Sequence, residues 1–180
     1  MSFNQLDPKP IQDDDSTIYT AMTPPETIAV DHLDDLDPLG PIKISPSSVP
    51  WPGSSFIIRS ASSGNVITLL DGQIVLDRPG SRGSFHWACV ETKGWIGFRN
   101  AVSGRFLGHD PSGKLHCSAQ RQQGWENFCV RLRPDGGYLL LMTHFERLWH
   151  VGIKMERGIE RLAKIGHGED DGMVFEFIKV

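Results

Sequence analysis

Apolar and polar residues alternate in short runs between about residue 54 and residue 180, and small or turn-forming residues separate these runs. The run Trp95–Arg99 ends before Ser103-Gly104, the run Arg105–Leu107 ends before the turn at 110–113, and Trp125–Val130 closes the unit. A period of two residues between glycine, proline, serine and aspartate is typical of strands and turns, not of helices. The pattern therefore predicts an all-β domain.

The same unit recurs three times. Ser63-Gly64 precedes Ser103-Gly104 by 40 residues, and a second turn glycine recurs at 72, 113 and 158. A closing aromatic run also recurs, at 85–90, 128–130 and 175–178. In the third copy Tyr138–Leu141 stands for the first strand, and Phe145-Glu146-Arg147 replaces the Ser-Gly turn, so the register there is open by one or two residues. A period of 40 to 45 residues indicates a repeat fold, and closure into a barrel leaves few unpaired edges.

Three such units resemble a β-trefoil of three four-stranded repeats, which is all-β. The run Gly104–Gly108, followed by Gly113-Lys114-Leu115 and Trp125–Phe128, is similar to the actin-cross-linking (fascin-like) branch of that fold. Gln123-Gly124-Trp125 also resembles the Gln-x-Trp mark of ricin-type lectin trefoils, but it occurs once. The resemblance implies a binding module, whereas the fold alone does not fix the ligand.

We expect two parts: a disordered, acidic, proline-rich tail at 1–53 and a trefoil domain at 54–180, with repeats at about 54–92, 93–134 and 135–180. The tail carries nine acidic side chains against two lysines and holds nine of the twelve prolines. Such compositions usually stay unfolded. The segment 28–36 alternates apolar and acidic residues, so it is either a docking segment or part of a solvated spacer.

We expect strands near 55–60, 66–70, 73–77 and 84–91 in the first repeat, and near 138–143, 148–153, 159–165 and 173–179 in the third. Their apolar side chains should form one core. The expected core residues are Phe56, Ile58, Leu69, Ile74, Leu76, Trp87, Phe98, Leu107, Leu115, Phe128, Val130, Leu141, Leu162, Phe175 and Phe177.

Composition and charge exclude several classes. No run approaches 18 apolar residues, so no membrane helix is expected, and the N-terminus lacks the pattern of a secretory signal. Three cysteines without paired spacing suggest reduced thiols in the cytoplasm or the nucleus. With a net charge of −4 on the chain, the part after residue 53 carries only +3, which argues against nucleic acid. The oligomeric state is not predicted.

Candidate chemistry is sparse. No metal-ligand spacing, nucleophile elbow, phosphate loop or dinucleotide fingerprint is present, so we expect no metal and no cofactor. If the protein is an enzyme, an acid–base pair must come from His109, His144, His150 and Glu146. Cys89 and Cys129 fall in closing strands and are interpreted as small packed side chains.

Aromatic residues beside polar groups offer the better candidates, because trefoil lectins stack a sugar on an aromatic ring and bind its hydroxyl groups nearby. The same aromatic rings are also ordinary core residues. The candidate ligand-binding residues are Trp125, Asn127, His109, Asp110, Trp149 and Arg105.

Three hypotheses follow. The first is a non-enzymatic module that binds a protein partner, actin-like or otherwise acidic, since arginine outnumbers lysine eleven to five after residue 53. The second is a cytoplasmic lectin of fungal type that binds a glycan. The third is a cofactor-independent enzyme, such as a cyclase or isomerase, with a histidine and an acid in a trefoil pocket.

Overall fold

A computed structural model describes residues 47–166 and 172–180. The predicted disordered tail and the candidate segment 28–36 lie outside these residues, apart from 47–53. Within them the chain forms twelve strands and one short 3-10 helix. They are β1 (Ser55–Ser60), β2 (Val66–Leu70), β3 (Gln73–Asp77), β4 (His86–Thr92), β5 (Trp95–Asn100), β6 (Phe106–His109), β7 (Leu115–Ala119), η1 (Gly124–Glu126), β8 (Phe128–Leu132), β9 (Tyr138–His144), β10 (Arg147–Glu156), β11 (Ile159–Lys164) and β12 (Val174–Lys179).

Six of the strands close into a barrel. β1 pairs with β4, β4 with β5, β5 with β8, β8 with β9, β9 with β12, and β12 returns to β1, all antiparallel. Every barrel strand therefore has a neighbour on both sides, which removes the open edges of a flat sheet. Each predicted repeat contributes two strands that lie side by side in this ring, namely its first and its last strand.

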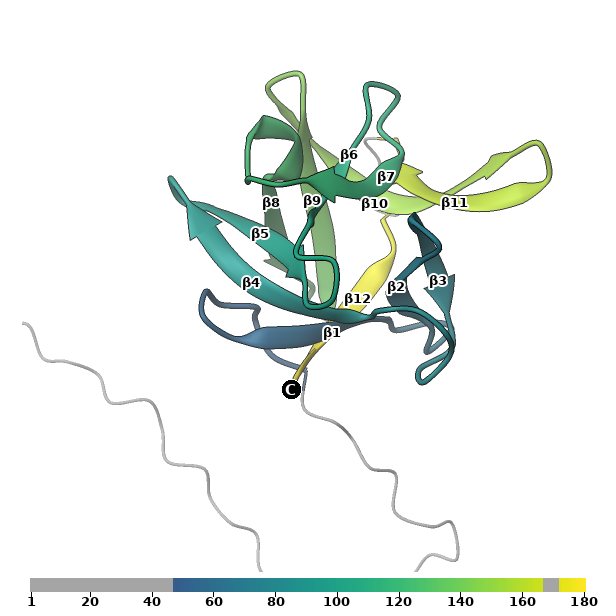
Figure 1. Ribbon diagram of the computed structural model, residues 1–180, viewed down its shortest axis with the longest axis horizontal. Coiled ribbons are helices and arrows are strands. Elements are labelled where there is room, and N and C mark those ends of the chain that lie inside the picture. The colour runs from purple at the N-terminus through teal and green to yellow at the C-terminus, as the bar shows by residue number, and fades with distance from the viewer. Residues whose placement is uncertain (1–46, 167–171) are drawn as a thin grey trace, which may run out of the picture. The chain divides into compact units, whose positions relative to one another are not determined.

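The other six strands form three hairpins, β2–β3, β6–β7 and β10–β11. Each hairpin follows the first barrel strand of its repeat, and β3, β7 and β11 contact one another. Figure 1 shows the β10–β11 hairpin reaching beyond the rest of the domain, at the right. A six-stranded barrel with three hairpins is the architecture of a β-trefoil, as the repeats predict.

The barrel encloses one apolar core. Most predicted core residues are buried in it, and Leu69, Leu76 and Val130 pack against it while partly buried. Leu141 is also buried, at 8% exposed, but it lies outside the core cluster that Leu140 and Met142 join. Successive side chains of a strand point to opposite faces, so in β9 the two neighbours of Leu141 face the barrel core. This is the repeat in which the sequence left the register open.

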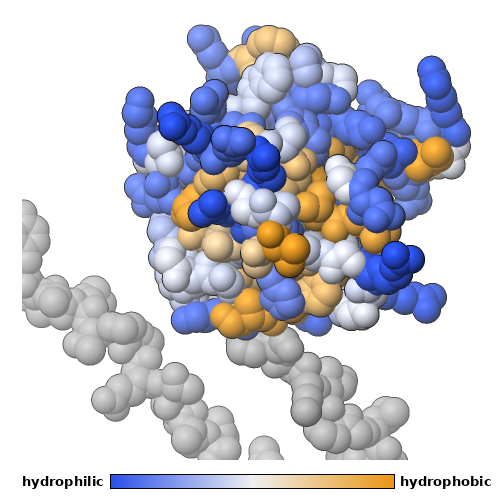
Figure 2. Space-filling model, viewed as in Figure 1, coloured by the Kyte–Doolittle hydropathy of each residue, from blue (hydrophilic) through white to orange (hydrophobic). Residues whose placement is uncertain are grey.

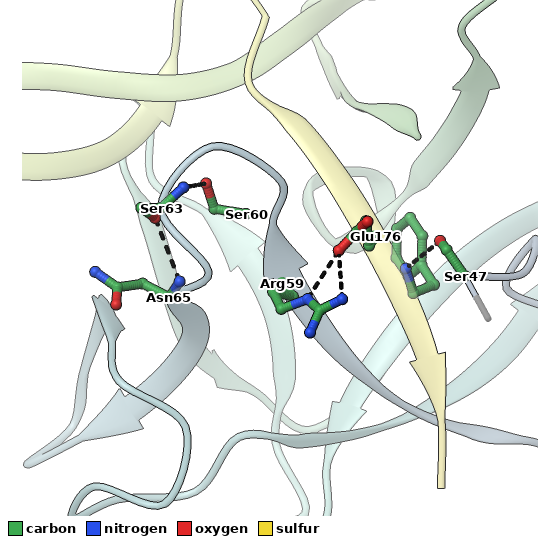
Figure 3. Close-up of polar contacts among 7 residues, drawn as sticks. Ser47, Arg59, Ser60, Ser63, Asn65 and Glu176 are labelled. Carbon is green, nitrogen blue, oxygen red and sulfur yellow. Dashed lines mark hydrogen bonds and ion pairs between the residues drawn. The ribbon is translucent and has the colours of Figure 1, made fainter. Parts of the chain in front are cut away.

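The last strand is held in place by polar contacts, which Figure 3 shows, and by apolar packing. The Arg59 guanidinium on β1 donates from Nε and Nη2 to one Glu176 oxygen on β12, at 2.8 and 2.7 Å. The Phe177 backbone N–H donates to the Ser47 Oγ at 3.1 Å. Partly exposed ion pairs contribute little stability, so the register of β12 rests mainly on Phe175 and Phe177, which are fully buried.

The three cysteines are free thiols. Burial raises the pKa of Cys89 to about 11, with a smaller contribution from the Glu91 carboxylate. Burial likewise raises the pKa of Cys117 to about 11 and raises that of Cys129. These thiols are therefore poor nucleophiles at neutral pH.

Within residues 47–166 and 172–180, no helix has the length and apolarity to cross a membrane.

Leu140→Ala is expected to lower the free energy of unfolding by about 2–5 kcal/mol, because it leaves a cavity in the closed core. Leu132→Ala is the control, since Leu132 also lies in a barrel strand but is 64% exposed. Urea titration followed by tryptophan fluorescence measures both. Equal losses in the two variants would contradict the inward orientation of Leu140.

Candidate functional site

The β9–β10 hairpin is longer than its counterparts in the other two repeats. Three equivalent hydrogen bonds set the register: the N–H groups of Ala61, Ala101 and Thr143 donate to the carbonyl oxygens of Val174, His86 and Asn127 at 2.9, 3.0 and 3.2 Å. In the first two repeats the connection closes after four residues, 61–64 and 101–104. In the third repeat Met142 pairs with Trp149, so six residues, 143–148, lie between them. Two extra residues therefore extend this hairpin outward.

The tip of this hairpin has a backbone conformation that its residues disfavour. Phe145 and Glu146 have φ values of 47° and 60°, where two-residue hairpin turns usually carry asparagine, aspartate or glycine. Left-handed conformations cost non-glycine residues about 1–2 kcal/mol each. Phe145 is also 74% exposed. An exposed aromatic side chain on a strained tip is typical of a functional position.

The helix η1 presents a second aromatic side chain beside that tip, and Figure 1 shows the two segments as neighbours. Trp125 is 41% exposed, and its ring stacks on His109 with 5.5 Å between centroids and 29° between planes. The Glu126 carboxylate is buried and accepts a hydrogen bond from the Gln123 N–H at 3.0 Å. A Cβ atom at Gly108 would lie 2.9 Å from Glu126 Oε1, so glycine makes room for this helix.

These segments surround an open pocket of about 330 Å³. Its lining residues are Trp95, Gly124, Trp125, Asn127, Thr143, His144, Phe145 and Glu146. The structure thus brings together four of the predicted site residues, Trp125, Asn127, His144 and Glu146. The Asn127 Oδ1 accepts from Gln122 Nε2 at 3.1 Å. Glu146 is exposed, and the two ion pairs found within the described residues involve other side chains.

Two buried histidines support the aromatic side chains of the pocket. The rings of His109 and His144 lie 5.0 Å apart, with Trp125 stacked on His109 and Phe145 in edge contact with His144 at 4.3 Å. His109 places Nδ1 2.9 Å from the Asp110 carbonyl oxygen and Nε2 2.5 Å from that of Thr143. His109 therefore supports the Trp125 ring from beneath and is not itself a ligand-binding residue.

Both ring nitrogens of His144 also have partners within the protein. Its Nε2 donates to the Pro111 carbonyl oxygen at 3.0 Å, and its Nδ1 accepts from Lys164 Nζ at 3.2 Å. Lys164 also lies over the Trp149 ring, 4.8 Å from its centroid, and Trp149 donates from Nε1 to the His144 carbonyl oxygen at 3.3 Å. Because internal partners take both ring nitrogens of each histidine, neither ring is placed to exchange a proton with a ligand. For His109 and His144 this geometry speaks against the acid–base hypothesis, whereas Nδ1 of the buried His150 has no hydrogen-bond partner among the described residues.

The remaining candidates lie outside the pocket lining. Trp149 is partly buried against the core. Asp110 organises the β6–β7 turn: partial burial acts to raise its pKa, but hydrogen bonds from the Ser112 hydroxyl and the Lys114 and Ser112 N–H groups hold that pKa below its usual range. Arg105 donates to the Ser118 carbonyl oxygen at 3.3 Å. His150 is buried in β10 opposite Leu141.

Sequence reasoning missed Thr143 and Phe145 as pocket residues. One signal for Phe145 was present, namely the Phe-Glu pair in place of the Ser-Gly turn of the other repeats. By itself that replacement indicates only an open register and not a binding residue. Across the described ranges, no group of three or more histidine, cysteine, aspartate or glutamate side chains is placed to hold a metal ion.

Replacing the tip by Phe145→Asn and Glu146→Gly is expected to stabilise the protein by about 1–2 kcal/mol, because both new residues adopt positive φ more readily. Differential scanning calorimetry measures the shift in Tm. As a control, Leu148→Asn alters an exposed residue of the same hairpin outside the turn. A Tm at or below that of the wild type in the double variant would contradict strain at the tip.

Comparison with known proteins gives matches in structure but none in sequence. No protein-family model matches the sequence, and no curated protein matches it. The structure is similar to a GH43 beta 1,3 galactosidase, with a TM-score of 0.60 and 12% identity over 73% of this chain. The match spans only 28% of the galactosidase.

Two smaller proteins are similar over nearly their whole length. A ricin B-like lectin of Macrolepiota procera, solved in complex with lactose, has a TM-score of 0.58 and 13% identity, over 74% of this chain and all of the lectin. A designed three-fold symmetric protein, ThreeFoil, has a TM-score of 0.57 and 11% identity, over 70% of this chain and 99% of the design. The resemblance to the fascin-like branch stays a prediction. At these identities the matches show the fold, and the described part of the chain is a β-trefoil.

Proposed function

We propose that this protein is a carbohydrate-binding module that binds a neutral glycan in the pocket beside Trp125. The observation that carries the proposal is the pair of exposed aromatic side chains, Trp125 and Phe145, which line one pocket from two different repeats. Aromatic rings offer apolar faces to the C–H groups of a sugar, and such pairs bury large areas. The pocket volume of about 330 Å³ lies at the lower end of the range for small-molecule sites, about 300–1,000 Å³.

Polar groups beside the rings supply hydrogen bonds for sugar hydroxyl groups. The Asn127 amide, the Thr143 hydroxyl and the Glu146 carboxylate belong to residues that line the same pocket. The Thr143 hydroxyl donates to the Gly124 carbonyl oxygen, so toward a sugar it acts as an acceptor. Asn127 is fixed by Gln122, which also donates to the Trp95 carbonyl oxygen at 3.0 Å. A few oriented polar groups within an apolar lining are the usual composition of a ligand site.

The comparisons support a glycan more than the protein partner that the sequence favoured, because a lectin in complex with lactose shares the fold. Lactose is therefore the first probe. His109 and His144 have no free ring nitrogen for proton transfer, so we propose binding without catalysis in this pocket. Location in the cytoplasm or the nucleus is a separate proposal, which rests on the three free thiols.

Trp125→Ala is expected to weaken lactose binding at least tenfold, which corresponds to about 1.4 kcal/mol, because it removes the stacking surface. Trp51→Ala is the matched control: Trp51 is also 41% exposed, but it packs on Phe56 at 5.3 Å and lines no part of the pocket. Isothermal titration calorimetry measures both, with circular dichroism as a check of folding.

The titration should also give one site per chain. Ser84 and Gly172 take the position of Trp125 in the other two repeats, as the equivalent hydrogen bonds of His86, Asn127 and Val174 show. If Trp125→Ala binds as the wild type does, or if lactose and a panel of neutral glycans all fail to bind the wild type, the proposal is wrong.

Glu146→Gln is expected to reduce the preference of the pocket for neutral sugars over acidic sugars. The Glu146 carboxylate repels a ligand carboxylate, and two charges 4 Å apart in water interact by about 1 kcal/mol. Wild-type protein should therefore bind galacturonic acid about fivefold more weakly than galactose. The variant should bind the two sugars with similar affinity. Competition against a fluorescent galactoside measures the ratio, and an unchanged ratio in the variant would remove Glu146 from the site.

A further inference from the structure

The β10–β11 hairpin carries cationic side chains in an arrangement that works against its own stability. Lys154 and Arg161 are directly opposite each other in the antiparallel pair, and like charges in that position are unfavourable. Arg157 follows at the turn with a φ of 51°, another conformation that favours glycine. A hairpin selected only for folding would avoid both features.

These charges have few partners within the domain. Arg161 donates to the Gln73 amide oxygen at 2.8 Å, which is a neutral partner. In the part of the chain that the structure describes, the two ion pairs are Arg59–Glu176 and Arg133–Asp135, and neither lies on this hairpin. Of these cationic side chains, Arg157 and Arg161 border an open hollow of about 550 Å³ and Lys154 does not. Its lining residues are Lys114, Glu156, Arg157, Ile159 and Arg161.

The same hairpin exposes three large apolar side chains. Ile153, Met155 and Ile159 are 39, 60 and 53% exposed. Ile159 lines the cationic hollow, and Ile153 and Ile159 line a second hollow of about 290 Å³ against Val75 and Leu76 of β3. Figure 2 shows an apolar spot flanked by hydrophilic side chains on the projecting arm of the domain, at the right. Apolar surface beside unpaired cations is typical of a binding surface.

One edge of β11 is also open. Within the described residues β11 pairs along its length with β10 alone. On its other side only its end is covered, where the Lys164 N–H donates to the Gly113 carbonyl oxygen at 2.8 Å and Ala163 bridges to Lys114. The backbone from Ile159 to Arg161 therefore presents hydrogen-bonding groups to an incoming chain.

We propose that the β10–β11 hairpin is a docking surface for an acidic, extended segment of a partner protein that also carries apolar side chains. Carboxylates of the segment would neutralise Lys114, Lys154, Arg157 and Arg161, and its apolar side chains would cover Ile153 and Ile159. A sulfated polysaccharide or a nucleic acid fits less well, because it would leave the apolar side chains of Ile153 and Ile159 exposed. This surface is separate from the glycan pocket, with which it shares no lining residue.

The test uses 15N-labelled full chain and three synthetic eight-residue peptides: alternating Asp and Leu, alternating Asn and Leu, and alternating Asp and Ser. The first should shift the amide signals of β10 and β11 with a Kd below 1 mM, and the other two should bind at least tenfold more weakly. Binding of the first peptide should weaken at least fivefold between 50 and 300 mM NaCl, because opposite charges are screened.

The variant Lys154→Ser with Arg157→Asn should bind the first peptide at least tenfold more weakly while its Tm stays equal or rises, since a like-charge contact and a disfavoured turn residue are removed. Arg78→Ser with Arg82→Ser removes the same charge from exposed positions elsewhere and should bind as the wild type. Three results would overturn the proposal: no amide shifts on β10–β11 at 1 mM peptide, equal binding of the Asp-Leu and Asp-Ser peptides, or tighter binding of a heparin hexasaccharide than of the Asp-Leu peptide.

Discussion

Closure of the six-stranded barrel is the constraint on which the rest of the structure depends. Each barrel strand is paired on both sides, and its alternate side chains meet at the centre, where Phe98, Phe128 and Phe177 are fully buried. Phe98 lies 5.9 Å from Phe128 and 5.8 Å from Phe177, between ring centroids. A shift of one residue in any barrel strand would turn its apolar side chains outward. The barrel therefore fixes where every hairpin and turn emerges.

Because closure fixes these positions, the connections between barrel strands are free to differ. The first two repeats use the same compact turn, in which Ser60 and Asn100 each accept a hydrogen bond from the N–H three residues ahead, Ser63 and Ser103. The third repeat replaces this turn with the extended Phe145-Glu146 tip. Its β10–β11 hairpin is also the longest of the three. The two surfaces proposed for binding are thus the two places where the third repeat departs from the others.

The fold could be predicted from the sequence because barrel strands obey a local rule. The period of two residues and the repeated turn glycines place most strands within a residue or two of their observed bounds. Leu141 shows where that rule ends: β9 begins Tyr-Leu-Leu-Leu-Met, and none of these five residues is a charged or strongly polar residue that would mark the outward face. Only pairing with β8, where Phe128 lies opposite Met142, decides which side chains face the core.

The site could be predicted only in part, because its residues meet across repeats. Trp125 and Asn127 carried a sequence signal, since both belong to a closing run. His109 and His144 are 35 positions apart, and the alignment of repeats does not match them with each other. Their contact arises because the two extra residues of the third repeat carry His144 outward to the β6–β7 turn, where it donates to Pro111. An alignment of repeats leaves the two inserted residues without a counterpart, so it does not predict their position. In the structure the same insertion forms one side of the pocket.

Strain at both surfaces has the same physical origin. Phe145, Glu146 and Arg157 all have positive φ values. In the first repeat the turn that corresponds to the Phe145-Glu146 tip uses Gly64, and the position that corresponds to Arg157 is held by Asp71. A side chain at a turn tip is the part of a hairpin that a ligand reaches first, and a glycine there offers no contact. Holding a side chain in this conformation costs free energy of folding, and packing in the closed barrel core offsets that cost. The cost of the strained tips therefore falls on the protein's overall stability.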